Sequence, residues 1–116
     1  MSSKELIQLL ASQYPPPDCG FIPEFRGDTR WSRESRADAI AMHLWPSMGL
    51  ELIGFDLKIS RGDWLRERKQ PHKADPIKQF CDKWYLLVSD LNIVKYADEL
   101  PEGWGLKYVE NGEIKP

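Results

Sequence analysis

Apolar residues recur at helical spacing near the start of the chain. Between residues 2 and 14, leucines and one isoleucine follow the spacing of a single helical face. Ser2 or Ser3, followed by Glu5, is a possible N-cap for this helix. The proline block at 15–17 must end it, because proline lacks the backbone N–H that an interior helical residue donates.

The next apolar segments predict three strands. "GFIPEFR", residues 20–26, indicates a short strand, which Pro23 restricts to an edge or an irregular position. After the polar stretch "GDTRWSRES" come two apolar runs, "RADAIAMHLW" at 36–45 and "LELIGFDLKIS" at 50–60. They flank "PSMG", which has the composition of a turn, so residues 36–59 predict a β-hairpin.

Helical signals follow this hairpin. Ser60 with Asp63 three residues later has the form of a capping box and predicts a helix through "GDWLRERK", residues 62–69. A second helical segment is expected in "DPIKQFCDKW", residues 75–84, where Pro76 occupies a tolerated first-turn position.

The last third of the chain returns to strand patterns. "WYLLVSD", residues 84–90, is the clearest buried strand, and "LNIVKYADEL", residues 91–100, predicts a short helical turn. Residues 101–116 add a final strand, with Asn111-Gly112 as a hairpin signal before "EIK". The expected fold class is α/β, with a mixed sheet flanked by helices in the order helix, strand, strand, strand, helix, strand and a C-terminal β extension.

Composition limits the class of protein. A length of 116 residues predicts one domain over 1–116, and 41% hydrophobic with 29% charged residues is typical of a soluble globular protein. No apolar run approaches the roughly 20 residues that span a bilayer. The polar start does not resemble a signal peptide, so we expect a cytoplasmic protein without a membrane partner. Cys19 and Cys81 fit reduced thiols, and Trp64, Trp84 and Trp104 fit packing positions.

Charge is distributed unevenly, although the net charge is only -2. Residues 60–73 carry a local excess of three positive charges, and a second basic run ends at Arg36. Such runs can attract a phosphate backbone, and the alternative is that they only solvate the surface. The candidates for nucleic-acid contacts are Arg36, Arg61, Arg66, Arg68 and Lys69.

An acid-x-lysine tripeptide carries the candidate chemistry. In a strand, Asp56 and Lys58 point to one face, while Phe55, Leu57 and Ile59 point to the opposite, buried one. A carboxylate can hold Mg²⁺, which takes oxygen ligands and keeps several waters, and the lysine can position or polarise an attacking water. The tripeptide therefore suits phosphodiester hydrolysis.

A second carboxylate is needed, and Asp38 on the preceding strand is the candidate. Asp38 lies opposite Asp56 if paired residue numbers sum to 94, and opposite Lys58 if they sum to 96. Either register places all three side chains on one face, whereas a sum of 95 sends Asp38 to the other face. We therefore expect a three-residue or five-residue connection, or a bulge.

The tripeptide alone is a weak signal. An acid two residues before a lysine is expected about once by chance in a chain of this length. Here it occurs three times, at Asp56, Glu67 and Glu113, and only Asp56 lies in a strongly apolar strand next to a plausible partner strand. The alternative for Asp56 and Lys58 is a surface salt bridge.

The chain also resembles the PD-(D/E)xK nuclease superfamily, and more closely its small MmcB-like members, which are associated with DNA repair and occur among phage proteins. "RADAIAM", "GFDLKISRGDWLRERKQPHK", "FCDKWYLLVSD" and "LPEGWGLKYVENGEI" carry the resemblance. It implies a restriction-endonuclease-like core and a Mg²⁺-dependent deoxyribonuclease, with Mn²⁺ able to substitute for Mg²⁺. Asp38, Asp56 and Lys58 match the family's catalytic acid and acid-x-lysine positions.

The resemblance also implies a further acid at the site. Glu24 is the first choice, and Glu5 and Glu34 are the alternatives. So small a nuclease would need two copies to cut both DNA strands together, which makes a homodimer possible. The alternative function is a catalytically inactive nuclease fold that acts as a DNA-binding or protein-interaction module.

Overall fold

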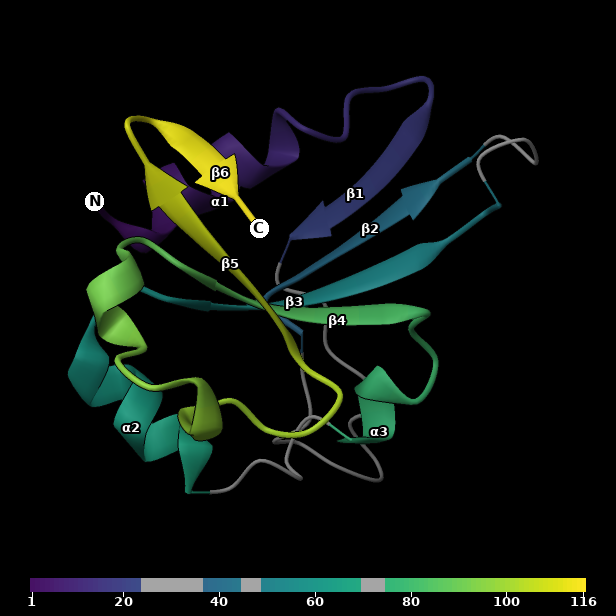
Figure 1. The fold of residues 1–116 in the computed structure, drawn as a ribbon. Helices are drawn as coiled ribbons and strands as arrows, with labels where there is room; N and C mark the ends of the chain where they lie inside the picture. Colours follow the sequence, from purple (N-terminus) through teal and green to yellow (C-terminus); the bar gives the residue numbers. More distant parts are fainter. Residues whose placement is uncertain (24–36, 45–48, 70–74) are drawn as a thin grey trace.

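The computed structural model describes residues 1–23, 37–44, 49–69 and 75–116 (Figure 1). The helices are α1 (Ser3–Ala11), α2 (Arg61–Arg68), α3 (Asp75–Lys78) and the 3₁₀ helices η3 (Leu91–Ile93) and η4 (Ala97–Glu99). The strands are β1 (Cys19–Pro23), β2 (Ala39–His43), β3 (Leu52–Lys58), β4 (Lys83–Val88), β5 (Gly105–Glu110) and β6 (Glu113–Lys115).

The strands form one mixed sheet in the order β1-β2-β3-β4-β5-β6. Neighbours pair antiparallel from β1 to β3 and again between β5 and β6. The β3–β4 and β4–β5 pairs are parallel, and parallel neighbours need crossover connections. The helices α2 and α3 lie in the first crossover, and η3 and η4 lie in the second. The expected class, a mixed sheet flanked by helices, is confirmed at this level.

Each face of the sheet has its own core. On one face, α1 packs Leu6 and Leu10 against Phe55 of β3. On the other face, Trp64 of α2 packs with Trp84 and Trp104, and all three rings are buried. Figure 1 shows α1 on the opposite side of the sheet from α2 and α3. The packing role expected for the three tryptophans is confirmed.

Local signals set the ends of several elements. Ser2 and Glu5 form a reciprocal capping box at the start of α1, and α1 ends before the proline block, as expected. Ser60 caps α2 by accepting a hydrogen bond from the Asp63 N–H at 3.2 Å. Asn111 has a positive φ of 53°, as a tight turn between β5 and β6 requires. The helices in the described ranges are all too short or too polar to cross a membrane.

The helix expected over 75–84 is much shorter in the structure. It ends at Lys78, and the chain has already joined the sheet at Asp82. The Asp82 N–H donates to the Leu52 carbonyl at 2.7 Å, and the Asp82 carboxylate accepts from the Leu52 N–H at 2.7 Å. These two bonds to β3 replace a further helical turn, so Cys81 lies outside the helix and is partly buried against the core.

Candidate functional site

The register between β2 and β3 brings the two candidate aspartates together. Ala39 lies opposite Phe55 and Met42 opposite Leu52, so paired numbers such as 39 and 55 sum to 94. The expected even-sum register is therefore confirmed, and Asp38 lies next to Asp56. The expected connection length is wrong, because β2 ends at residue 43 and β3 begins at residue 52. Part of that connection, residues 45–48, lies outside the described residues.

Asp38 is fixed by the backbone on both sides of Asp56. Its N–H donates to the Phe55 carbonyl at 2.9 Å, and its Oδ2 accepts from the Leu57 N–H at 2.8 Å. Because Phe55 and Leu57 flank Asp56 in β3, these bonds hold the Asp38 carboxylate beside the Asp56 side chain. The sheet itself therefore sets the spacing of the pair.

Asp56 is buried with only part of its charge compensated. It is 6% exposed, and the neighbouring residue on β4 is the fully buried Leu86. Its Oδ1 lies 3.5 Å from Lys58 Nζ, whereas its buried Oδ2 accepts no hydrogen bond from the described residues. A buried carboxylate oxygen without a donor is costly, which makes Asp56 a candidate for binding a ligand.

Burial raises the pKa of Asp56 well above its usual range. The Lys58 ammonium opposes this shift, while the carboxyl groups of Asp38 and Glu67 raise the pKa further. The Asp38 side chain raises the pKa of Asp56 both as a hydrogen-bonding neighbour and through its charge. Burial is the largest cause of the raised Asp56 pKa and the nearby Asp38 carboxyl group adds to it, and a cation bound beside Asp56 would lower that pKa.

Lys58 lies between two carboxylates. Its Nζ is 3.5 Å from Asp56 Oδ1 and 3.6 Å from Glu67 Oε2. Burial alone would lower the pKa of Lys58, but the charges of Asp56, Glu67 and Asp38 outweigh it and raise that pKa. Lys58 is therefore an ammonium at neutral pH, which can donate hydrogen bonds but cannot accept a proton.

The donor set fits Mg²⁺. This cation binds oxygen, commonly through one or two carboxylates, and completes its shell with water and substrate phosphate. Asp38 and Asp56 supply such a pair, and Asp56 Oδ2 has the uncompensated charge. In the part of the chain that the structure describes, no three His, Cys, Asp or Glu side chains form a metal-binding group. Among the described residues, Asp38 and Asp56 are the candidate ligands for such a cation.

The third acid expected from the sequence is not settled. Glu24 and Glu34 lie outside the described residues. Glu5 is ruled out as a neighbour of the aspartates, because its carboxylate bonds to Ser2 in the α1 cap. The helix α1 packs on the Phe55 face of the sheet, which is opposite to the Asp56 face.

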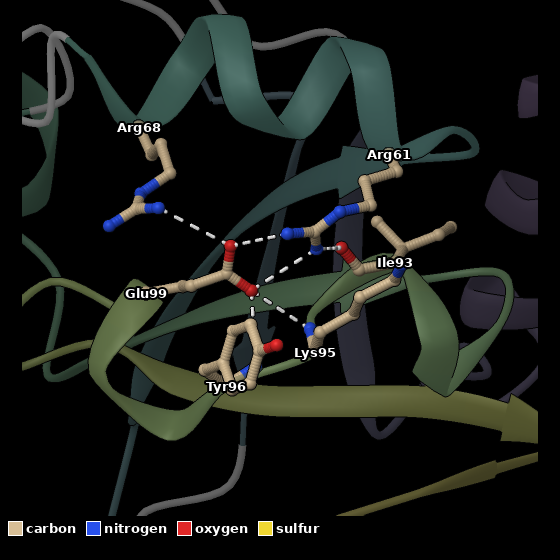
Figure 2. A network of polar contacts seen from close by, with 6 residues as sticks. All are labelled: Arg61, Arg68, Ile93, Lys95, Tyr96 and Glu99. Atoms are coloured by element: carbon tan, nitrogen blue, oxygen red, sulfur yellow. Dashed lines mark hydrogen bonds and ion pairs between the residues drawn. The ribbon is translucent and has the colours of Figure 1, made fainter.

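Two of the candidate DNA-contacting arginines are bound to Glu99 (Figure 2). Arg61 makes a two-pronged ion pair with the Glu99 carboxylate at 3.1 and 2.8 Å, and Arg68 approaches it at 3.3 Å. The backbone N–H groups of Lys95 and Tyr96 also donate to Glu99, at 2.9 and 3.1 Å. This network joins α2 to the segment between η3 and η4. Arg61 and Arg68 therefore make contacts within the protein that hold these segments together.

Glu99 is as buried as Asp56, but the pKa of its carboxyl group is shifted in the opposite direction. The Arg61 hydrogen bonds, helped by the two backbone N–H groups, lower the pKa of Glu99 to about 2. Both of its oxygens accept hydrogen bonds. A buried carboxylate with a full set of donors is typical of a structural position, and the contrast makes the unsatisfied Asp56 the better functional candidate.

The other basic candidates differ in exposure. Arg66 pairs with Asp63 on the same helix, and its side chain is 76% exposed. Lys69, which caps the C-terminal end of α2, is also exposed. Arg36 lies outside the described residues. DNA contact stays a prediction for all five candidates. Among the described ones, Arg66, Arg68 and Lys69 are exposed, and of these Arg68 also pairs with Glu99.

Glu67 is the site residue that the sequence interpretation missed. In the sequence, Glu67 stands out only as one of three acid-x-lysine matches, together with Lys69. The structure pairs it instead with Lys58, because the capped helix α2 starts just after β3 and its last turn reaches back to that strand. The available signal was an acid in the last turn of a basic helix that directly follows the strand of Asp56 and Lys58.

Comparison of the chain with protein-family models, with curated proteins and with solved structures found no match.

Proposed function

We propose that this chain is a Mg²⁺-dependent deoxyribonuclease of the PD-(D/E)xK type, which hydrolyses phosphodiester bonds. The observation that carries the proposal is the pairing of Asp38 with a buried, partly uncompensated Asp56, beside the ammonium of Lys58. A pair of carboxylates next to a lysine is the arrangement that metal-assisted phosphodiester hydrolysis needs.

Each side chain has a separate task in this proposal. Asp38 and Asp56 hold Mg²⁺, which when bound stabilises the negative charge that develops on the phosphate. Lys58, kept charged by its neighbours, donates hydrogen bonds to the attacking water or to a phosphate oxygen and so orients them. The water oxygen bonds to phosphorus as one ester P–O bond breaks, which leaves a phosphomonoester and a hydroxyl end.

The order of the elements supports the same family. A helix, three strands, a helical crossover and a further strand follow one another, as in the restriction-endonuclease-like core that the sequence resembles. The proposed catalytic residues agree with the positions that the resemblance implies, with Asp38 directly before β2 and Asp56-Leu57-Lys58 at the end of β3. The preference for DNA is what this resemblance implies.

Exposed basic groups near the site support a nucleic-acid substrate. Arg66 and Lys69 lie at the C-terminal end of α2, the same end from which Glu67 reaches Lys58. Contacts from such groups to phosphates would make binding salt-dependent, with a slope that falls by about one for each phosphate contact removed.

A panel of labelled DNA structures tests the proposed activity. Single-stranded, duplex, nicked, mismatched and branched DNA are incubated with the protein in Mg²⁺, in Mn²⁺ and in excess chelator. We expect cleavage of at least one structure that requires the divalent cation and that disappears in Asp38→Asn. Failure of the wild-type protein to cut any of them would favour the alternative, a binding module on a nuclease fold.

A further inference from the structure

The position of Glu67 is set by the fold rather than by its own ion pair. Ser60 caps α2 two residues after Lys58, and the helix then places Glu67 in its last turn. The neighbouring Arg68 is anchored to Glu99 at 3.3 Å, which fixes that turn independently. The Glu67 carboxylate is therefore presented to Lys58 by a helix that is already held in place.

Three carboxyl groups of the described residues act on the Lys58 ammonium. They belong to Asp56, Glu67 and Asp38, and Asp56 and Glu67 form ion pairs with Lys58. A divalent cation at the aspartates would compete with the Lys58 ammonium for the charge of Asp56, and the two cations would repel each other. Lys58 then still has Glu67, whose Oε2 lies 3.6 Å from the Lys58 Nζ and which is not one of the two aspartates.

We propose that Glu67 is a positioning residue for Lys58. When a divalent cation is bound by Asp38 and Asp56, the Glu67 carboxylate attracts the Lys58 ammonium away from Asp56 and holds it in the site. The inference rests on the proposed function, because it takes Asp38 and Asp56 as the ligands of that cation. Without Glu67, the ammonium has only the two aspartates as counter-charges and competes with the cation for them. Glu67 thus allows the Lys58 ammonium and the metal ion to occupy the same acidic site together.

A double-mutant cycle on metal affinity tests this role. Mn²⁺ binding is measured by calorimetry at fixed pH and ionic strength for the wild type, Glu67→Gln, Lys58→Met and the double variant. With Lys58 present, we expect Glu67→Gln to weaken Mn²⁺ binding about tenfold, because the released ammonium competes for Asp56. In the Lys58→Met background, the same substitution should change Mn²⁺ affinity by no more than about twofold.

Controls separate positioning from general charge effects. Asp63→Asn removes one negative charge from the same helix at a residue that pairs with Arg66, so its Mn²⁺ affinity should stay within about twofold of the wild type. Glu67→Asp keeps the charge and should recover part of the lost affinity. Urea unfolding of each variant without metal checks that the fold is intact.

The outcomes distinguish this inference from the proposed function. Equal losses of Mn²⁺ affinity in both Lys58 backgrounds would make Glu67 a metal ligand rather than a positioning residue, and no loss in either would make it only a helix residue. Both results overturn the inference and leave the function standing, provided that Asp38→Asn abolishes Mn²⁺ binding. If wild-type protein binds no Mn²⁺, the inference and the proposed function fail together.

Discussion

Two acid-x-lysine pairs in this protein have the same spacing and nearly the same ion-pair distance. Asp56 and Lys58 in β3 are 3.5 Å apart, and Glu113 and Lys115 in β6 are 3.4 Å apart. The first two side chains are 9% and 14% exposed, whereas the second two are 73% and 44% exposed. The same tripeptide spacing therefore forms a buried acidic site in one strand and a surface ion pair in the other.

The neighbours of each strand explain the difference. Strand β3 is central, with Asp38 beside Asp56 on one side and the buried Leu86 on the other. Strand β6 is an edge strand with one partner, so water solvates its side chains. A charge in a central strand has to be compensated by the protein or by a ligand, whereas a charge at a solvated edge has no such need.

The largest expected difference is in DNA cleavage, when the lysine of each pair, Lys58 or Lys115, is substituted. If the chain has the proposed nuclease activity, Lys58→Met should lower the rate of DNA cleavage by at least about 100-fold, because it removes the group proposed to orient the water or phosphate. Lys115→Met is the matched control and should cleave at the wild-type rate. The measurement is single-turnover cleavage of the best substrate from the DNA panel. Equal activity of the two variants would break the comparison.

A smaller effect, on stability, is expected from substituting Glu99, the buried carboxylate whose oxygens both accept hydrogen bonds. Glu99→Gln should lower the free energy of unfolding by about 2 kcal/mol at pH 7, since it leaves Arg61 without its ion-pair partner. Glu113→Gln, the exposed counterpart, should change it by less than about 0.5 kcal/mol.

The stability supplied by Glu99 should also depend on pH. Because the pKa of Glu99 falls from 4.5 to about 2 on folding, its contribution is complete above pH 4.5 and is lost as the pH falls toward 2. Urea unfolding at pH 7 and at pH 3 measures this. A constant difference between wild type and Glu99→Gln at both pH values would contradict the ion-pair account.

The smallest predicted effect has the opposite sign. Without metal at pH 7, Asp56→Asn should stabilise the protein by about 1 kcal/mol, because it removes a buried charge whose Oδ2 has no donor among the described residues. The pKa of Asp56 is raised on folding, so the wild type is least penalised below its unfolded value of 3.8 and loses stability as the pH rises. Urea unfolding at pH 7 and pH 4 should show the gain shrinking at the lower pH. A destabilised Asp56→Asn at pH 7 would make Asp56 a structural residue.

Much of the fold could be predicted from local signals. The capped helices, the register of the 36–59 hairpin and the Asn111-Gly112 turn each depend on residues close together in the sequence. The early end of α3 could not be predicted in this way, because Asp82 leaves the helix to bond with Leu52, which lies far away in sequence.

The same limit applies to the site. The even-sum register is predicted because Asp38, Asp56 and Lys58 have to share one face, but the sequence leaves open whether Asp38 lies opposite Asp56 or opposite Lys58. The contact between Glu67 and Lys58 depends on how far α2 returns over the sheet, and the capture of Arg61 by Glu99 depends on a second crossover. Both are set by tertiary packing, which periodicity does not reveal.

A divalent-metal titration followed by thermal unfolding tests the central claim most directly. Mg²⁺ and Mn²⁺ are titrated into wild type, Asp56→Asn and the surface control Glu113→Gln. At about 100 times the dissociation constant, a bound cation should stabilise the wild type and Glu113→Gln by about 2.7 kcal/mol, a rise in Tm of several degrees. Asp56→Asn should show no such rise. An equal metal response in all three proteins would contradict a shared metal site at Asp38 and Asp56 and return the pair with Lys58 to an ordinary salt bridge.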